Sequence, residues 1–325
     1  MTRFIMRRLA ILPVAVLLVH FMGFSYAHLA RPIRAARNPF IAATVEAEPL
    51  LPAYKSYLQE ALRLDFGDMP TSPGVREPIL SVIAEAGLAS LGLLTIALIF
   101  STLLGLGMGL LAVRPNPPRV ASWLTMFSTV GLAMPSFYIG SLFMLASLTY
   151  LLKGGYGTQL ILPIKGFGWD RHLVLPTLAL LARPTVQIAQ VTAELLMDEL
   201  AKQYVVAARA VGHTWRAIRW RLALRNIVAA VILSIGGSVR LLVGELIVVE
   251  WLFEWPGLGR QLALTLIPAQ TSTPTQEPLF LAPRVVAAVL VVFASLFLIT
   301  DFIAAVLVRV SDPRLRISEE EASHA

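Results

Sequence analysis

Residues Tyr204–Asn226 read YVVAARAVGHTWRAIRWRLALRN and lie between two long apolar stretches of the chain. With Lys202 included, the segment carries six cations, so it is expected outside the hydrocarbon layer of a membrane. Apolar side chains recur along it at steps of three and four residues, the period of one helix face. They are Ala208, Val211, Trp215, Ile218 and Leu222. We predict a short helix, broken around Gly212, that lies on the membrane surface and presents this face either to a partner protein or to anionic lipid.

The composition is that of a membrane protein. Hydrophobic residues make up 57% of the chain and charged residues 14%, with a mean hydropathy of +0.72, which is far more apolar than soluble proteins are. The net charge of +7 is accounted for by basic residues beside apolar spans and by phospholipid headgroups, and nucleic acid is not expected as a partner. The chain has no cysteine, which excludes disulfides, thiolate metal sites and a cysteine nucleophile.

Six apolar stretches are long enough to cross a bilayer, which takes about 20 residues. They cover about 9–30, 85–113, 120–152, 173–197, 227–250 and 284–309. The predicted fold is therefore an all-α integral membrane protein with six transmembrane helices, organised as one domain over residues 1–325. The segment 31–84 follows the first span; it is too short and too rich in proline for a separate domain, and one helix is predicted in it at 53–64.

The distribution of basic residues predicts the orientation. An even number of spans places both termini on one side, and fourteen cations fall on that side against five in the short loops opposite. Cytoplasmic loops carry the excess of Lys and Arg, so both termini and the loop 198–226 are predicted to be cytoplasmic, and 31–84 external. Arg31, Arg34 and Arg37 directly follow the first span and oppose this bias, but the other cations outnumber them.

Several patterns resemble a known family. Ala208-Arg209-Ala210 with Gly212, followed by Leu224-Arg225-Asn226, is similar to the cytoplasmic coupling loop of bacterial ABC importer permeases, in the branch that serves dipeptides, oligopeptides and nickel. Further similar stretches are Leu132–Phe137, Glu250–Gly259 and Ser311–Arg316. The resemblance covers nearly the whole chain and implies the type I ABC importer permease fold in a bacterial inner membrane.

The resemblance also implies partners and roles. In this family the loop fits a cleft on an ATPase subunit, and the residues expected to couple to it here are Ala208, Arg209, Ala210, Gly212, Trp215, Ile218 and Arg225. The implied partners are a second homologous permease, two ABC ATPases, an extracytoplasmic substrate-binding protein and membrane lipid. The chain has no glycine-rich loop ending in Gly-Lys-Ser/Thr, so ATP and Mg²⁺ are expected on the partner ATPase, and no cofactor or catalytic residue is expected in this chain.

Charged residues inside the apolar spans are costly and mark candidate positions along a transport path. The charged candidates are Arg183, Arg240, Glu245 and Glu250, with Asp301 as a further charge, and Pro135 is a candidate because it would kink a helix that lines the path. Arg183 and Glu245 would offer both signs of charge to a zwitterionic peptide. Alternatively, these residues pair with each other or with a second subunit only to hold helices in register. Glu250 has the further alternative of supporting the turn that follows it, and Pro135 is expected to kink the third span.

Two packing predictions concern other positions. Gly105 and Gly109 lie four residues apart on the second span, which allows a neighbouring helix to approach closely. Trp251, Phe253 and Trp255 are predicted to form an aromatic belt at the outer membrane interface.

Peptides are the first expected cargo, and nickel or a nickel complex is the alternative. The five histidines show no ligand-like spacing, so no metal site is expected within the chain. An intramembrane hydrolase would need a motif such as Gly-x-Ser-Gly with a partnering histidine, which is absent. An ion-driven transporter using Asp301 and Glu245 would usually show internal repeats, and no convincing duplication is present.

Overall fold

The computed structural model describes residues 2–35, 48–72, 75–154, 158–266 and 281–311. Most of the C-terminal motif, residues 312–316, lies outside the described residues. The helices in chain order are α1 (Thr2–Ala35), α3 (Leu50–Ala61), α4 (Ile79–Ala112), α5 (Ser122–Ala133), α6 (Ser136–Lys153), η1 (Arg171–Leu173), α7 (Val174–Leu200), α8 (Gln203–Ala210), α9 (Trp215–Ala217), η2 (Ile218–Ala223), α10 (Leu224–Leu252), α11 (Leu258–Leu266) and α12 (Pro283–Ser311). The short strands β1 (Asp68–Ser72) and β2 (Val75–Pro78) pair antiparallel, as do β3 (Val113–Pro115) and β4 (Pro118–Val120).

Six helical segments in the described part of the chain are long and apolar enough to cross a membrane. They are Leu9–Arg34, Ile79–Ala112, Ser136–Lys153, Arg171–Leu200, Trp215–Leu252 and Pro283–Leu307. The predicted all-α fold with six spans is confirmed. The helix expected at 53–64 is α3, which begins at Leu50 and ends at Ala61.

The third span differs from the prediction. Instead of one helix over 120–152 with a kink, α5 ends at Ala133 and a separate helix, α6, begins at Ser136. Met134 between them is extended, with φ −93° and ψ 114°, because a residue that precedes a proline is disfavoured in the helical region. Pro135 therefore breaks the span completely, and of the two pieces α6 alone is long enough to cross.

The chain forms two compact units. One contains Leu93–Leu252 together with α12 from Ile299 onward, and the other contains Thr2–Gly92 together with Phe253–Leu298. Helices α4 and α12 contribute residues to both units.

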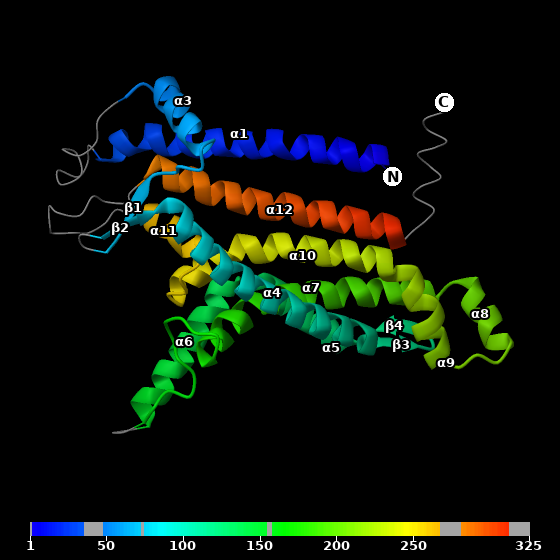
Figure 1. The fold of residues 1–325 in the computed structure, drawn as a ribbon. Coiled ribbons are helices and arrows are strands. Elements are labelled where there is room, and N and C mark those ends of the chain that lie inside the picture. Colours follow the sequence, from blue (N-terminus) through cyan, green and yellow to red (C-terminus); the bar gives the residue numbers. More distant parts are fainter. Residues whose placement is uncertain (1, 36–47, 73–74, 155–157, 267–280, 312–325) are drawn as a thin grey trace. The chain divides into compact units, whose positions relative to one another are not determined.

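In the first unit, α7 is the central helix and packs against α5, α6 and α10 (Figure 1). The contact of α7 with α4 depends on Gly105 and Gly109, the two glycines that were predicted to allow a close helix approach. A Cβ at Gly105 would lie 2.8 Å from Thr185 O and from Ile188 Cβ, and one at Gly109 would lie 2.6 Å from Ala189 O. The absence of these side chains lets α4 and α7 approach closely, as predicted.

Gly105→Ala and Gly109→Ala are each expected to destabilise the protein by about 1–3 kcal/mol, because the new methyl group would force the two helices apart. Gly107→Ala is the matched control on the same helix, since a Cβ there meets no atom within 4 Å. Thermal unfolding of the purified variants measures the difference. Equal melting temperatures for all three variants would contradict the close contact.

In the second unit, α3 packs on α1 through a small cluster around Phe24, Tyr57 and Ala287. Two of the three residues predicted to form an aromatic belt are also buried here: Phe253 is 1% exposed and Trp255 is 0% exposed. Trp255 Nε1 donates to Ala89 O at 3.1 Å, so its single polar atom is satisfied inside the protein. The belt prediction is therefore wrong for these two residues, and of the three only Trp251 is largely exposed, at 48%.

Candidate transport and coupling sites

The predicted coupling segment is two short helices joined by a tight turn. Helix α8 ends at Ala210, and Gly212 adopts φ +94°, a conformation that favours glycine, although a Cβ at this position would meet no atom within 4 Å. The chain then enters α9, where Thr214 Oγ1 accepts a hydrogen bond from Ala217 N at 3.2 Å. Arg209 closes the turn by donating to His213 O at 2.7 Å and by stacking 4.9 Å from the ring centre of Trp215.

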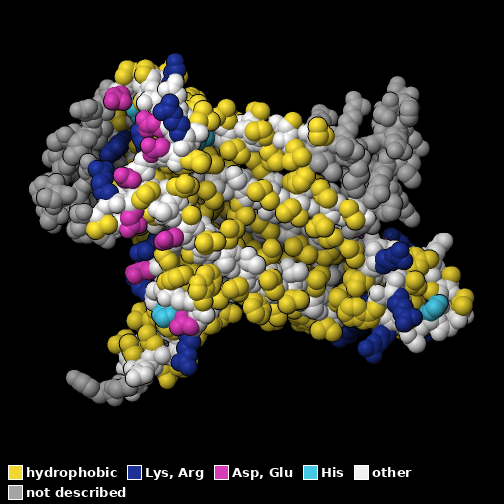
Figure 2. Space-filling model, viewed as in Figure 1, with side chains coloured by type: hydrophobic (Ala, Val, Ile, Leu, Met, Phe, Trp, Pro, Cys, Tyr) yellow, Lys and Arg dark blue, Asp and Glu magenta, His cyan; other side chains and the backbone are white. Residues whose placement is uncertain are grey.

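The predicted apolar face of this segment is divided. Ile218 is 0% exposed, and Ala208 and Trp215 pack against the same apolar cluster that holds it, whereas Val211 is 81% exposed. The break at Gly212 is as predicted, but the apolar face is not presented as a whole, because most of these residues pack against the protein and only Val211 is largely exposed. Figure 2 shows Lys and Arg side chains gathered over α8 and α9, beside helices covered with hydrophobic side chains. The segment is thus attached by its apolar residues and presents a basic surface.

A buried carboxylate that the sequence analysis did not single out joins both ends of the segment. Glu199, at the end of α7, is 5% exposed and accepts from Tyr204 Oη at 3.0 Å, from Asn226 Nδ2 at 2.7 Å and from Lys202 Nζ. Burial, followed by the hydrogen bond to Glu199, raises the pKa of Tyr204 to about 12, so its hydroxyl stays protonated and donates at neutral pH. The network ties α8 and α10 to the end of α7.

Glu199→Gln is expected to destabilise the protein by about 1.5–3 kcal/mol, because hydrogen bonds to a charged acceptor are lost and an amide donor then faces the Asn226 amide. The neighbouring exposed acid gives the matched control, Asp198→Asn, for which almost no change is expected. The measurement is chemical or thermal unfolding in detergent. If both variants unfold alike, the network does not stabilise the loop.

The charged path candidates form two separate pairs. Arg183 on α7 forms an ion pair with Glu245 on α10, and Arg240 Nη1 lies 3.0 Å from Asp301 Oδ1 on α12. Arg183 Nε and Glu245 Oε2 are buried atoms for which the described residues provide no hydrogen-bond partner. Each charge is therefore neutralised by its neighbour, while one donor and one acceptor of the first pair are left for water or a ligand.

The other two candidates lie elsewhere. Glu250 is 0% exposed near the end of α10, and Pro135 sits at the break between α5 and α6. The structure brings neither into the two ion pairs.

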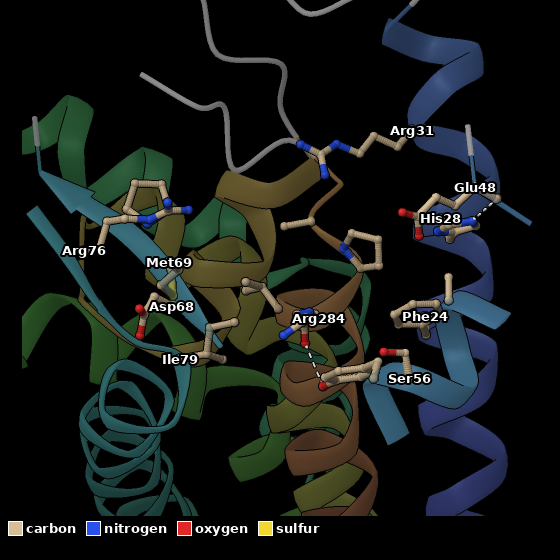
Figure 3. Close-up of a pocket in the computed structure, with 16 residues that line it drawn as sticks. Phe24, His28, Arg31, Glu48, Ser56, Asp68, Met69, Arg76, Ile79 and Arg284 are labelled. Carbon is tan, nitrogen blue, oxygen red and sulfur yellow. Dashed lines mark hydrogen bonds between the residues drawn. The ribbon is translucent and has the colours of Figure 1, made fainter. Parts of the chain in front are cut away.

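A pocket of about 440 Å³ belongs to the other unit and lies among α1, α3, the β1–β2 hairpin and the start of α12 (Figure 3). Side chains of both charges line it: Arg31, Arg76, Arg284, Glu48 and Asp68. The Arg284 guanidinium lies over the ring of Tyr57, with its central carbon 5.3 Å from the ring centre. Burial raises the pKa of this tyrosine to about 12. Arg284 Nη1 also pairs with Glu60 Oε2 at 2.8 Å. The pocket is thus a polar, mixed-charge surface on an aromatic floor.

No group of three or more His, Asp or Glu residues in the described ranges is placed to hold a metal ion.

The comparisons with known proteins agree with the predicted resemblance. Residues 101–317 match the family described as binding-protein-dependent transport system inner membrane component, a range that contains the coupling segment and both ion pairs. The chain is similar to a dipeptide transport system permease protein of Lactococcus lactis, with 30% identity over 271 residues that cover 83% of this chain and 82% of the relative. It is also similar to a glutathione transport system permease protein of Salmonella choleraesuis, with 32% identity over 278 residues (81% and 86%). An oligopeptide transport system permease protein of Bacillus subtilis is 27% identical over 285 residues (87% and 85%).

Proposed function

Because this chain belongs to the binding-protein-dependent transport system inner membrane components, the permease subunits of ABC importers, we propose that it forms part of a membrane passage for dipeptides and oligopeptides. The observation that carries the proposal is the basic segment from Gln203 to Ala223. It is anchored to α7 and α10 and presents its charged surface away from these membrane helices. A segment built in this way transmits movement of a bound partner to the membrane helices.

The partners proposed for this chain are a second, homologous permease, two ABC ATPases and an extracytoplasmic binding protein. ATP and Mg²⁺ bind to the ATPases, and this chain contributes no catalytic group. The termini and the coupling segment are proposed to be cytoplasmic, because the excess of Lys and Arg on that side follows the rule for short cytoplasmic loops.

The proposed transport cycle is alternating access. Closure of the two ATPases moves α8 and α9, and the Glu199 network passes this movement to α7 and α10. These two helices carry the Arg183–Glu245 pair, which is proposed to lie on the path and to contact the charged ends of the peptide. Coupling is proposed to depend on Ala208, Arg209, Ala210, Gly212, Trp215, Ile218 and Arg225.

Co-expression of the chain with the ATPases and sister permease encoded beside it, followed by reconstitution in lipid vesicles, tests the proposal. The expected result is co-purification of the ATPases and ATP-dependent uptake of a radiolabelled dipeptide delivered by the binding protein. Uptake of Ni²⁺ but not of peptides would replace the proposed cargo. A chain that purifies without an ATPase, or uptake driven by a proton gradient without ATP, would overturn the proposed function.

A further inference from the structure

One face of α7 carries a line of polar side chains within a span that is otherwise apolar. The polar stripe consists of Arg183, Gln187, Gln190 and Glu194. At 3.6 residues per turn, steps of four, three and four keep these positions within about 60° of one another and spread them over about 17 Å of helix. On the opposite face, Ile188, Thr192 and Leu196 are all 0% exposed, whereas every residue of the stripe is partly or largely exposed in this chain.

Lipid tails are an unsuitable surrounding for this stripe. Amide and carboxylate groups at membrane depth face a protein interior or a water-filled cavity, because hydrocarbon leaves their polar atoms unsatisfied. Glu194 receives one hydrogen bond, from Gln190 Nε2 at 3.0 Å, and within the described residues no cation pairs with it. Gln187 Oε1 and Glu245 Oε2 are buried acceptors to which no described residue donates a hydrogen bond.

A cavity of about 290 Å³ opens beside the stripe, between α5 and α7, which lie side by side (Figure 1). Its lining includes Gln190 and Glu194 from α7 and Ser128 and Thr129 from α5. Ser128 Oγ donates its proton to Leu124 O at 2.6 Å and Thr129 Oγ1 donates to Thr125 O at 3.0 Å. Both hydroxyl oxygens are therefore left with acceptor lone pairs only.

The hydrogen-bond acceptors that line this cavity favour a ligand that donates hydrogen bonds. Two hydroxyl oxygens and a carboxylate with no basic partner among the described residues are suited to a protonated amino group, which carries a positive charge and up to three hydrogen-bond donors. The volume lies at the lower limit of small-molecule pockets, so the cavity accommodates one end of a peptide rather than a whole oligopeptide.

We propose that the polar stripe of α7 lines a water-filled passage and that the cavity between α5 and α7 binds the protonated amino terminus of the cargo through Glu194. This inference rests on the proposed function, since it assigns a peptide subsite within the permease. It adds Gln187, Gln190, Glu194, Ser128 and Thr129 to the charged pair as residues in contact with the passage.

Cysteine labelling tests the water-filled passage, and the natural chain is suited to it because it contains no cysteine. Gln190→Cys and Glu194→Cys are made singly, assembled with the partner subunits in membrane vesicles and exposed to a charged, water-soluble thiol reagent. Both are expected to react, since the reactive thiolate forms in water. The matched control is Ala193→Cys, which is 0% exposed on the same helix and should stay unlabelled, and Gln159→Cys, exposed outside the spans, reports the full reaction.

The result that overturns the passage is an assembled complex in which Gln159→Cys reacts but neither stripe position does, because the stripe would then be covered by the partner permease. Since the wild-type complex is tested separately for ATP-driven uptake, this outcome leaves the proposed function in place. Protection of Gln190→Cys by a dipeptide supports the subsite, because Gln190 lines the same cavity and this variant keeps the Glu194 carboxylate.

Uptake kinetics of Glu194→Gln test the amino-group contact. The variant keeps the shape of the side chain but loses its charge, and KM for an unmodified dipeptide is expected to rise about tenfold, the loss typical of a hydrogen bond to a charged group. KM for the same dipeptide with an acetylated amino terminus should not change. Equal effects on both peptides, or no effect on either, would refute the assignment of Glu194 to the amino group.

Discussion

Glu245→Leu is expected to destabilise the protein by about 1–3 kcal/mol, less than the usual cost of breaking a fully buried ion pair because both side chains are partly exposed. Arg183, whose side chain is 28% exposed, would keep its charge inside a membrane-spanning helix without the carboxylate that now neutralises it. Thermal unfolding of the purified complex, together with the amount of chain recovered from the membrane, measures the loss.

The double variant Arg183→Leu/Glu245→Leu separates stability from transport. Replacing both members of a buried pair by apolar residues is often neutral, so this variant is expected to recover most of the lost stability. Peptide uptake should nevertheless remain abolished if the pair contacts the cargo, as proposed. Normal uptake by the double variant would show that the pair only holds α7 to α10. An unchanged melting temperature for Glu245→Leu alone would contradict the ion pair itself.

Gly212→Val is expected to abolish peptide uptake while the partner ATPases continue to hydrolyse ATP. The φ of +94° is strained for any side chain and most of all for a β-branched one, at a cost of about 1–3 kcal/mol, so the turn between α8 and α9 would rearrange. ATP hydrolysis and uptake measured on the same vesicles give the ratio of ATP hydrolysed to peptide transported, which should rise sharply.

Gly212→Asn is the control for this prediction. Asparagine is similar in size to valine but tolerates the left-handed conformation, and the chain leaves open space around this position. Uptake by the asparagine variant should therefore stay close to that of the unchanged protein. If valine and asparagine are equally harmful, the cause is the size of the side chain at a partner surface rather than the backbone; if both variants transport normally, the turn has no part in coupling.

The local features of the fold could be predicted from the sequence because they depend on short-range patterns. Six apolar runs of sufficient length predicted the six spans, and the four-residue step between Gly105 and Gly109 predicted the close approach of a helix. The break at Gly212 was likewise predicted, from the glycine that lies inside the helical pattern. The complete break at Pro135 was underestimated, because a proline in a membrane helix is compatible with either a kink or an end, and the neighbouring packing selects between them.

The partners of the buried side chains could not be assigned without the tertiary structure. The composition of the spans identified Arg183, Arg240 and Glu245 as charges in need of partners, but Arg183 and Glu245 are 62 positions apart, and their pairing depends on how α7 and α10 are rotated against each other. Trp255 was predicted at the membrane interface because its residue type is common there, yet its contact with Ala89 places it in the core.

The sequence by itself therefore determined the class of the protein and the number of its spans, since both follow from residue types counted along a short stretch. Only the tertiary structure decided which charges neutralise one another and that Glu199 ties the coupling segment to α7 and α10. The physical reason is that an ion pair or a buried hydrogen bond requires atoms from distant helices within about 3 Å of each other, and helix packing sets that distance.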